Sequence, residues 1–357
     1  MKAIHGGDIY RNRVKLDFSV NINPLGMPEE AVRAMRLAAG LCCRYPDPEA
    51  EELKKAVSVA YRLPAEWLLF GNGASELFLA AAHGLRPEKV LIPVPSFYGY
   101  EHAAKAAGSR IRWLELKREN GFRAGEELLS ALTPDIGLLF LANPNNPTGA
   151  LTENRLLAAV LERCQRQGIV VVLDECFIEF CGGGHSLLPA LERFPNLCVI
   201  RAFTKIYAIP GVRLGWLACA DDELRGRIAA QLPEWNLSCF AQAAGCACAG
   251  LEDYVERTRR IVRTERAFLK ERLEGLGIRV FPGEADFLLL YAQRPLYEEL
   301  LGRGILIRDC TSFRGLGKGF YRIAVKSRRE NEILLQALRE GKEAAPDSRK
   351  GEREWKD

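Results

Sequence analysis

Short, strongly apolar runs alternate with segments of helical spacing along the first two thirds of the chain. The runs are KVLIPV at 89–94, IRWLEL at 111–116, IGLLFLA at 136–142, IVVVLDE at 169–175, LCVIRAF at 197–203 and LGWLACA at 214–220. Helical patterns separate many of them, for example over 152–167 and 221–232. Strands that are apolar on both faces and alternate with helices are typical of a parallel sheet covered by helices. The pattern therefore predicts an α/β domain with a largely parallel sheet.

The pattern changes at about residue 238. Residues 238–274 predict one or two helices, and shorter strand-like runs follow at 278–281, 286–291, 304–309 and 320–325, before a closing helix near 328–340. We therefore expect a large domain over 45–237 and a smaller α+β domain over 238–340. The segment 1–44 has few strand signals, and we expect it to pack with the smaller domain. The polar, charge-mixed tail 341–357 predicts disorder.

Composition narrows the function classes. The chain has 357 residues, 48% of them hydrophobic, with 50 basic and 46 acidic side chains and a net charge of +4. This balance, without a basic stripe, argues against nucleic-acid binding. No apolar run approaches the roughly 18 residues of a membrane span, and the start does not resemble a signal peptide, so we expect a cytoplasmic protein with no membrane partner. The eleven cysteines form no CxxC pair, and we expect reduced, buried thiols and no structural metal.

Two glycines open a probable helix in GNGASELF at 71–78. Backbone N–H groups at such a helix start, at Ala74 and Ser75, can bind an anion. Taken alone, a glycine-rich turn is most often a plain turn, because Gly and Asn are common turn residues. No GK[ST] follows, so this segment is not a nucleotide-binding P-loop.

Three further motifs follow strand-like runs. Asn146 lies in LANPNNPTG at 141–149, and Asp174 ends the apolar strand of VVVLDECFIEF at 170–180. A carboxylate there is costly unless a cation pairs with it, and either a cationic ring nitrogen or a structural arginine would serve. RAFTKIYAIPGVRLGW at 201–216 places Lys205 between Thr204 and Arg213. Lysine suits Schiff-base chemistry because desolvation readily lowers its pKa, and the hydroxyl and the guanidinium can bind a phosphate.

The order of these motifs resembles the fold-type I pyridoxal-phosphate enzymes, the aspartate aminotransferase superfamily. The resemblance implies pyridoxal 5'-phosphate as cofactor, with Lys205 as the Schiff-base lysine, Asp174 as partner of the pyridine nitrogen and Asn146 as contact to the ring 3-hydroxyl. It also implies a phosphate cup, a stacking aromatic and a tyrosine lent to the neighbouring subunit of a homodimer. These are Ala74, Ser75, Thr204 and Arg213 for the cup, Phe97 in PSFYGYE for the stack, and Tyr45 in RYPDP for the neighbouring site.

Within this superfamily the chain is similar to histidinol-phosphate aminotransferases, and more so to the threonine-phosphate decarboxylases of cobalamin biosynthesis. HGGDIY at 5–10, LDFSVNINPLG at 16–26 and GILIRDCTSFRGLGKGFYRIAVK at 304–326 carry the narrower resemblance. It implies that the N-terminal segment covers the active site. It also implies substrate-binding roles for His5, Gly6 and Asn21, and for Arg308 and Arg322, which would face the carboxylate and the phosphate of the substrate in an order that stays open.

The resemblance implies decarboxylation of L-threonine O-phosphate to (R)-1-aminopropan-2-ol phosphate, or of L-serine O-phosphate to ethanolamine phosphate, for the nucleotide loop of cobalamin. Aminotransferases of this kind usually have DEAY where this chain has DECF, so Phe177 lacks the usual hydroxyl. The alternatives are an aminotransferase for histidinol phosphate or an aromatic amino acid, and a non-catalytic binding protein of the same fold. A nicotinamide dehydrogenase is disfavoured, because no GxGxxG follows a first strand.

Overall fold

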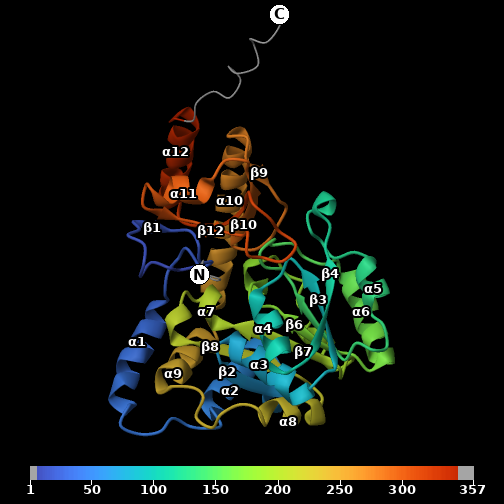
Figure 1. Ribbon diagram of the computed structural model, residues 1–357. Coiled ribbons are helices and arrows are strands. Elements are labelled where there is room, and N and C mark those ends of the chain that lie inside the picture. The colour runs from blue at the N-terminus through green and yellow to red at the C-terminus, as the bar shows by residue number, and fades with distance from the viewer. Residues whose placement is uncertain (1–5, 345–357) are drawn as a thin grey trace, which may run out of the picture.

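A seven-stranded sheet forms the centre of the larger half of the protein (Figure 1). The structure is a computed structural model that describes residues 6–344. The strand order is β2-β8-β7-β6-β5-β3-β4, and β8 alone runs antiparallel to its neighbours. The strands are β2 (Leu68–Asn72), β3 (Lys89–Val94), β4 (Arg110–Glu115), β5 (Leu138–Ala142), β6 (Val170–Asp174), β7 (Leu197–Ala202) and β8 (Leu214–Ala218). The predicted α/β class with a mostly parallel sheet is confirmed.

Two strands differ from the apolar pattern. The apolar runs of the sequence predicted the other strands but not β2, which ends in Gly71 and Asn72 and pairs with β8 at one edge of the sheet. The other edge strand, β4, is half-buried rather than buried on both faces. The glycine-rich end of β2 weakens its strand pattern although most of the strand is buried, whereas β4 is partly open to solvent at the edge of the sheet.

Helices pack around this sheet, and some of them begin close to the end of a strand. They are α2 (Glu51–Tyr61), α3 (Ala74–Leu85), α4 (Tyr98–Ala106), α5 (Glu127–Ala131), α6 (Asn154–Gln167), α7 (Phe203–Ile206) and α8 (Asp222–Ala229). Short 3-10 turns lie at η1 (Ala39–Leu41), η2 (Ala65–Trp67), η3 (Arg118–Asn120), η4 (Ile178–Phe180), η5 (Leu188–Ala190) and η6 (Pro210–Val212). α3 starts two residues after β2, and α7 directly after β7. The carboxyl ends of parallel strands are where ligands bind in such sheets.

A second sheet with the order β12-β13-β10-β9 lies above the first in Figure 1. Its strands are β9 (Arg279–Val280), β10 (Phe287–Tyr291), β12 (Arg308–Asp309) and β13 (Phe320–Ala324), and its helices are α10 (Glu252–Gly275), α11 (Leu296–Leu301) and α12 (Arg328–Ala344). The run at 304–309 is divided. Its first half, β11 (Ile305–Leu306), pairs in parallel with β1 (Leu16–Asp17), and the two form a separate two-stranded sheet that ties the N-terminal segment to this half of the protein.

The packing does not follow the predicted boundary at 238. α9 (Cys239–Cys248) and the first half of α10 bury side chains in the same core as the large sheet, whereas Leu269 and Leu273 at the end of α10 belong to a second core, which also contains Phe18. α1 (Glu29–Ala38) packs on α9 rather than on the second sheet. α12 continues four residues past the predicted limit of 340, and residues 345–357 of the predicted tail lie outside the described part of the chain. Cys42 and Cys43 are exposed, contrary to the expectation that the thiols are buried.

A buried ion cluster supports the strands that carry the site. Arg201 on β7 donates from Nη2 to Glu175 at 2.8 Å and to Ser186 at 2.7 Å. Both charged side chains of the Arg201–Glu175 pair are almost completely buried. Glu179 lies 3.9 Å from Arg201. Removing one member of a buried pair leaves the other charge without compensation in a dry interior.

We therefore expect Arg201→Met to lower the free energy of unfolding by about 3–5 kcal/mol, the usual cost of breaking a buried pair. Arg193→Met is the matched control, because Arg193 pairs with Glu162 while its side chain is 69% exposed, and such pairs contribute about 0–1 kcal/mol. Urea unfolding of both variants measures the difference. Equal losses would contradict a stabilising role for the buried cluster.

Candidate active site

A cavity of about 210 Å³ lies at the carboxyl end of the large sheet, where the second sheet and the N-terminal segment meet it. Most of the residues expected from the sequence line it together. They are Gly6, Asn21, Ala74, Ser75, Phe97, Asn146, Asp174, Thr204, Lys205, Arg213, Arg308 and Arg322. His5 lies outside the described residues. Tyr45 does not line the cavity; it is 79% exposed and packs on Trp235, with ring centroids 4.9 Å apart.

One end of the cavity is built to bind an anion. Gly73 has φ +77° and precedes α3, whose first turn has no side-chain cap, so its backbone N–H groups are available. Arg213 lies against this turn, and a Cβ on Gly73 would be 2.3 Å from its Nη2 atom. Gly215 packs behind Ala74 just as closely, with a Cβ position 2.6 Å from the Ala74 nitrogen. A guanidinium beside the start of a helix is an arrangement suited to a phosphate.

Asp174 ends β6 as a buried carboxylate with hydrogen bonds but no cation. The Cys176 backbone N–H donates to its Oδ1 at 2.9 Å, and the Tyr100 hydroxyl donates to its Oδ2. Burial raises the pKa of Asp174, while the hydrogen bonds from Cys176 and Tyr100 oppose this rise. Within residues 6–344, no lysine or arginine forms an ion pair with Asp174, so the structural-arginine alternative is not realised. The carboxylate is left for a cationic group in the cavity.

Tyr100 is a site residue that the sequence reasoning missed. It lies on α4, three residues after Phe97, is fully buried and stacks on Phe140 with ring centroids 5.4 Å apart. Its side chain thus fixes the orientation of Asp174 from the far side of the cavity wall. The signal that could have found it is the spacing of three from Phe97, which places both side chains on one face of a helix start.

Lys205 lies on the short helix α7, and it is half-buried. Burial lowers the pKa of Lys205, and the nearby Arg322 and Arg213 charges act in the same direction, while Asp286 opposes them. A lowered pKa favours the neutral amine, which is the nucleophilic form that can attack an aldehyde.

The second sheet contributes two arginines to the cavity. Arg322 on β13 donates from Nη1 to Asn146 Oδ1 and from Nη2 to the Ser19 carbonyl at 3.0 Å. Arg308 on β12 donates to Ser312 Oγ at 3.0 Å. Burial lowers the pKa of both guanidinium groups, that of Arg322 to about 10. Both guanidinium groups lie on the cavity wall, where a bound anion would compensate for the water that they lose on burial.

Asp286 is a second carboxylate that the sequence reasoning missed. It is 0% exposed, and neither side-chain oxygen has a hydrogen-bond partner in the structure. Burial raises its pKa to about 7, against the lowering effect of Lys205, Arg322 and Arg266. An isolated aspartate just before β10 gives no signal in sequence, because its importance depends on which cations the fold brings near it.

The fold and the site define a member of a known family. The family model for aminotransferase class I and II matches residues 13–338. The chain therefore belongs to that family, and it is a pyridoxal-phosphate-dependent enzyme, as the sequence motifs indicated.

Several relatives cover nearly the whole chain. Threonine-phosphate decarboxylase from Salmonella typhimurium is 41% identical over 351 residues, which are 94% of this chain and 96% of that protein. An adenosylcobalamin biosynthesis bifunctional protein from Leptospira interrogans is 32% identical over 94% of this chain and 40% of its own length. Histidinol-phosphate aminotransferase from Clostridium acetobutylicum has a solved structure that superposes with a TM-score of 0.87 at 32% identity, covering 92% of this chain and 100% of that one.

The residues present fit pyridoxal 5'-phosphate. The turn at Gly73 and Arg213 suits its phosphate, and the half-buried amine of Lys205 suits its aldehyde. Among the described residues no lysine or arginine pairs with the buried Asp174, and a protonated pyridine nitrogen would supply that cation.

The unusual pKa of Asp286 predicts a pH-dependent stability. The carboxyl has a pKa of 3.8 in the unfolded chain and about 7 in the folded protein. Its preference for the folded state is therefore fully present below pH 3.8 and is lost as the pH rises through about 7. The cofactor-free Asp286→Asn variant should therefore gain stability relative to the unaltered protein between pH 5 and pH 8, as measured by urea unfolding.

Asp135→Asn is the control for this prediction. The Lys89 and Thr133 side chains hold the pKa of the exposed Asp135 at about 2, so its charge does not change between pH 5 and pH 8. Its stability difference from the unaltered protein should stay constant over that range. A constant difference for Asp286→Asn as well would contradict the raised pKa.

Proposed function

We propose that this protein decarboxylates an O-phosphorylated amino acid, L-threonine O-phosphate or L-serine O-phosphate. The observation that carries the proposal is the number of cations in the cavity. Among the described residues, four basic side chains line it, Lys205, Arg213, Arg308 and Arg322, against the carboxylate of Asp174. Arg213 would bind the phosphate of the cofactor, and Lys205 would bind its aldehyde. Arg308 and Arg322 add two guanidinium groups to the same cavity, which suits a substrate with both a carboxylate and a phosphate.

The proposed cofactor contacts follow from the geometry. Ala74, Ser75, Thr204 and Arg213 would bind the phosphate, Phe97 would stack on the ring, and Asn146 would contact the 3-oxygen. Bound pyridoxal phosphate supplies an electron sink for a bond at the substrate Cα. Asp174, oriented by Tyr100, would keep the ring nitrogen protonated. The amine of Lys205 would hold the cofactor and later carry a proton to Cα.

Decarboxylation rather than transamination requires the carboxylate, not the Cα hydrogen, to stand perpendicular to the ring. The substrate would be held at both ends, by Arg322 and Arg308, and anchoring remote groups orients the reacting centre. Gly6 and Asn21, which line the cavity from the N-terminal segment, would help to hold the substrate and exclude water. Phe177 is buried and packs edge-on against Phe287 at 5.1 Å, so it offers no hydroxyl to the cofactor. Together with the 41% identical decarboxylase, these features favour loss of CO₂.

A product assay tests the reaction. We expect the protein with pyridoxal phosphate to convert L-threonine O-phosphate or L-serine O-phosphate to an amino-alcohol phosphate and CO₂ without any 2-oxo acid. The two substrates differ by one methyl group, and a pocket discriminates between such substrates by only about 1–3 kcal/mol. Both are therefore assayed. The product would serve the nucleotide loop of cobalamin. Transfer of the amino group of histidinol phosphate to 2-oxoglutarate, which yields glutamate, would instead establish an aminotransferase, the alternative that the similarity to that family allows. No turnover of either kind would favour a binding protein.

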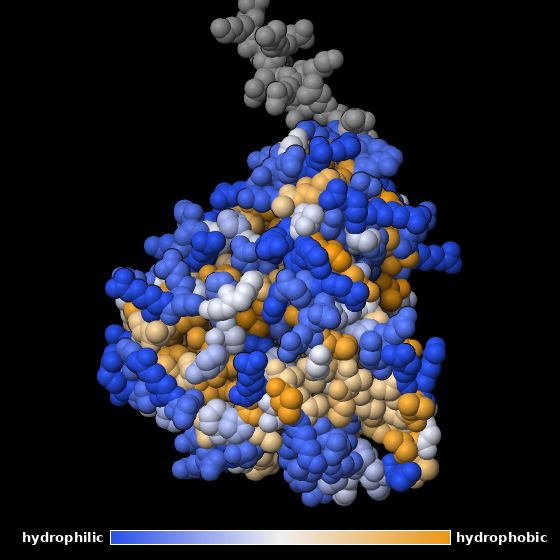
Figure 2. All heavy atoms as spheres, turned by 180° about the vertical axis from the view of Figure 1, so that it is seen from behind, coloured by the Kyte–Doolittle hydropathy of each residue, from blue (hydrophilic) through white to orange (hydrophobic). Residues whose placement is uncertain are grey.

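The exposed apolar side chains support a homodimer as part of the proposal. Leu37 and Val59 are 80% and 79% exposed on α1 and α2, and Tyr45 and Trp235 are exposed with their rings in tilted contact. In the view from behind, hydrophobic residues gather at the lower right, the side where α1 and α9 lie (Figure 2). Tyr45 would reach the cofactor of the partner, which explains why it lies outside the cavity of its own chain.

Light scattering in solution should therefore give a mass about twice the 39.8 kDa of the chain. We expect Leu37→Glu to shift the protein towards the mass of one chain, because it places a charge on the proposed interface. Arg155→Glu on helix α6 is the control, because it also changes the charge of an exposed position but lies away from the proposed interface. A single-chain mass for the unaltered protein would contradict the dimer.

A further inference from the structure

The hydroxyl, the N–H and the carbonyl of Ser19 all form hydrogen bonds, although the residue lies in a loop. It is 1% exposed. Its hydroxyl accepts from the Gly7 N–H at 2.7 Å and donates to Asp17 Oδ1 at 2.6 Å, and its own N–H donates to the same oxygen at 2.8 Å. Its carbonyl accepts from Arg322 at 3.0 Å. Ser19 thus joins the N-terminal segment to an arginine of the active-site cavity.

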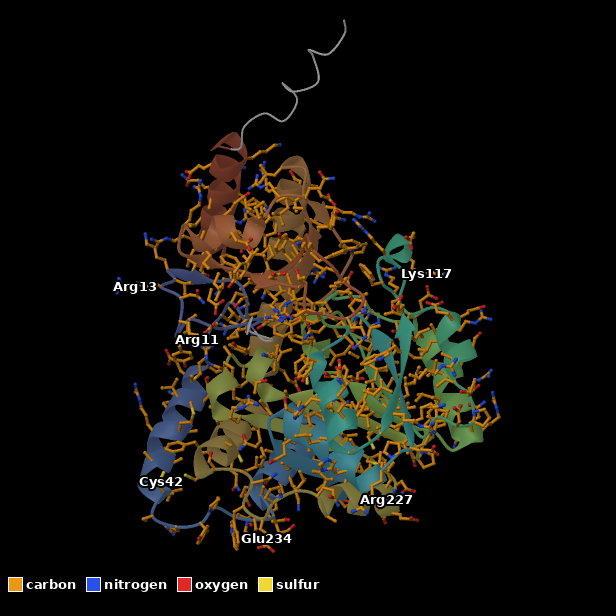
Figure 3. All side chains as sticks on the ribbon, viewed as in Figure 1. Arg11, Arg13, Cys42, Lys117, Arg227 and Glu234 are labelled. Carbon is orange, nitrogen blue, oxygen red and sulfur yellow. The ribbon has the colours of Figure 1, made fainter. Side chains whose placement is uncertain are left out.

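Residues 6–12, called the strap here, lie directly on Ser19. A Cβ on Gly6 would be 2.2 Å from the Ser19 carbonyl oxygen, so a side chain here would push the strap away. The strap is also folded on itself, with Ile9 N–H donating to the Gly7 carbonyl at 2.8 Å. Among the described residues, the Gly7–Ser19 contact is the hydrogen bond that ties the strap to the rest of the chain. In Figure 3 the labelled Arg11 marks the strap, which runs between α1 and the second sheet.

The strap separates two cavities. On its other side lies an outer cavity of about 370 Å³, which Asp8, Arg11 and Asn12 of the strap line together with residues of the second sheet. Gly6, Ser19 and Arg308 line both this outer cavity and the active-site cavity. The wall between the two is therefore thin, and its position depends on the contacts that Ser19 makes. Release of the strap would join the two cavities and admit water to the site.

We propose that Ser19 is a positioning residue that holds the strap over the active site and links its closure to Arg322. The proposal rests on the proposed function, in which Arg322 binds an anion of the substrate. Arg322 donates to Asn146 and to Ser19, so an anion that fixes its guanidinium also fixes the Ser19 backbone. The Ser19 hydroxyl then holds Gly7, and the strap stays closed while the substrate is bound. The structure thus links substrate binding to the exclusion of water through one serine.

Hydrogen exchange in the cofactor-free protein tests the strap contact without any substrate. Ser19→Ala removes the hydroxyl that accepts from Gly7, and we expect the peptide containing residues 6–12 to exchange about fivefold faster, the effect of one lost hydrogen bond. Ser238→Ala is the matched control, since the Ser238 hydroxyl accepts from the Ala241 N–H at 3.2 Å at the start of α9, outside the cavity lining. It should leave exchange in the strap unchanged. Unchanged exchange in Ser19→Ala would overturn the proposal.

Kinetics of the loaded enzyme test the link to Arg322. For L-threonine O-phosphate we expect Ser19→Ala to raise KM about tenfold and to lower kcat less than threefold, because the residue positions a binding group rather than reacting. In the unaltered enzyme, the substrate should slow exchange of the strap peptide, and in Ser19→Ala it should not. Substrate-induced protection that persists in the variant, or a KM that does not change, would overturn the positioning role. If the unaltered protein turns over no phosphorylated amino acid, the proposed function fails, while the exchange of the cofactor-free proteins still decides the strap contact.

Discussion

The burial of charge is the constraint on which this structure depends. Asp174 and Arg322 are buried and Lys205 is half-buried around one cavity, and the loss of water shifts each pKa towards the neutral form. An isolated buried charge is expensive, so such groups persist where hydrogen bonds and opposite charges compensate them. The protein supplies part of that compensation through Tyr100, Asn146 and Ser19. The rest comes from a ligand that carries a protonated ring nitrogen and several anionic groups, which describes the cofactor and the proposed substrate together.

The fold brings these charges together from distant parts of the sequence. Asp174 and Lys205 stand at the carboxyl ends of β6 and β7, two adjacent parallel strands, and the buried pair of Arg201 and Glu175 holds the same two strands together. Arg322 comes from a separate sheet, about a hundred residues later in the chain. The site is therefore assembled only when both sheets and the N-terminal segment are in place. This arrangement would let one cavity bind both ends of the proposed substrate.

Those site residues that lie within a local sequence motif could be predicted from the sequence. Lys205, Asp174 and the turn at Gly73 lie within motifs, and the apolar strands before them identify the end of the sheet on which they lie. β2 was missed because its glycine-rich end makes a weak strand pattern, although its long-range pairing with β8 makes it part of the sheet. The boundary at 238 was placed where the sequence pattern changes from strands to long helices. That change does not reveal that α9, which follows it, shares the core of the large sheet.

Asp286 and Ser19 could not have been found in this way. Nothing in an Ala-Asp-Phe or Phe-Ser-Val sequence indicates a role, and each becomes important only through neighbours more than eighty residues away: Lys205 for the first and Arg322 for the second. Tyr45 illustrates the opposite case, since its motif was evident but its partner would lie in another chain.

The covalent link to Lys205 is the central claim, and chemical trapping measures it most directly. Borohydride reduction of the protein loaded with pyridoxal phosphate, followed by digestion and mass spectrometry, identifies the lysine that carries the cofactor. The account predicts one modified peptide that contains Lys205, and none in a Lys205→Ala variant. Modification spread over exposed lysines such as Lys55 and Lys105, with Lys205 unmodified, would contradict it.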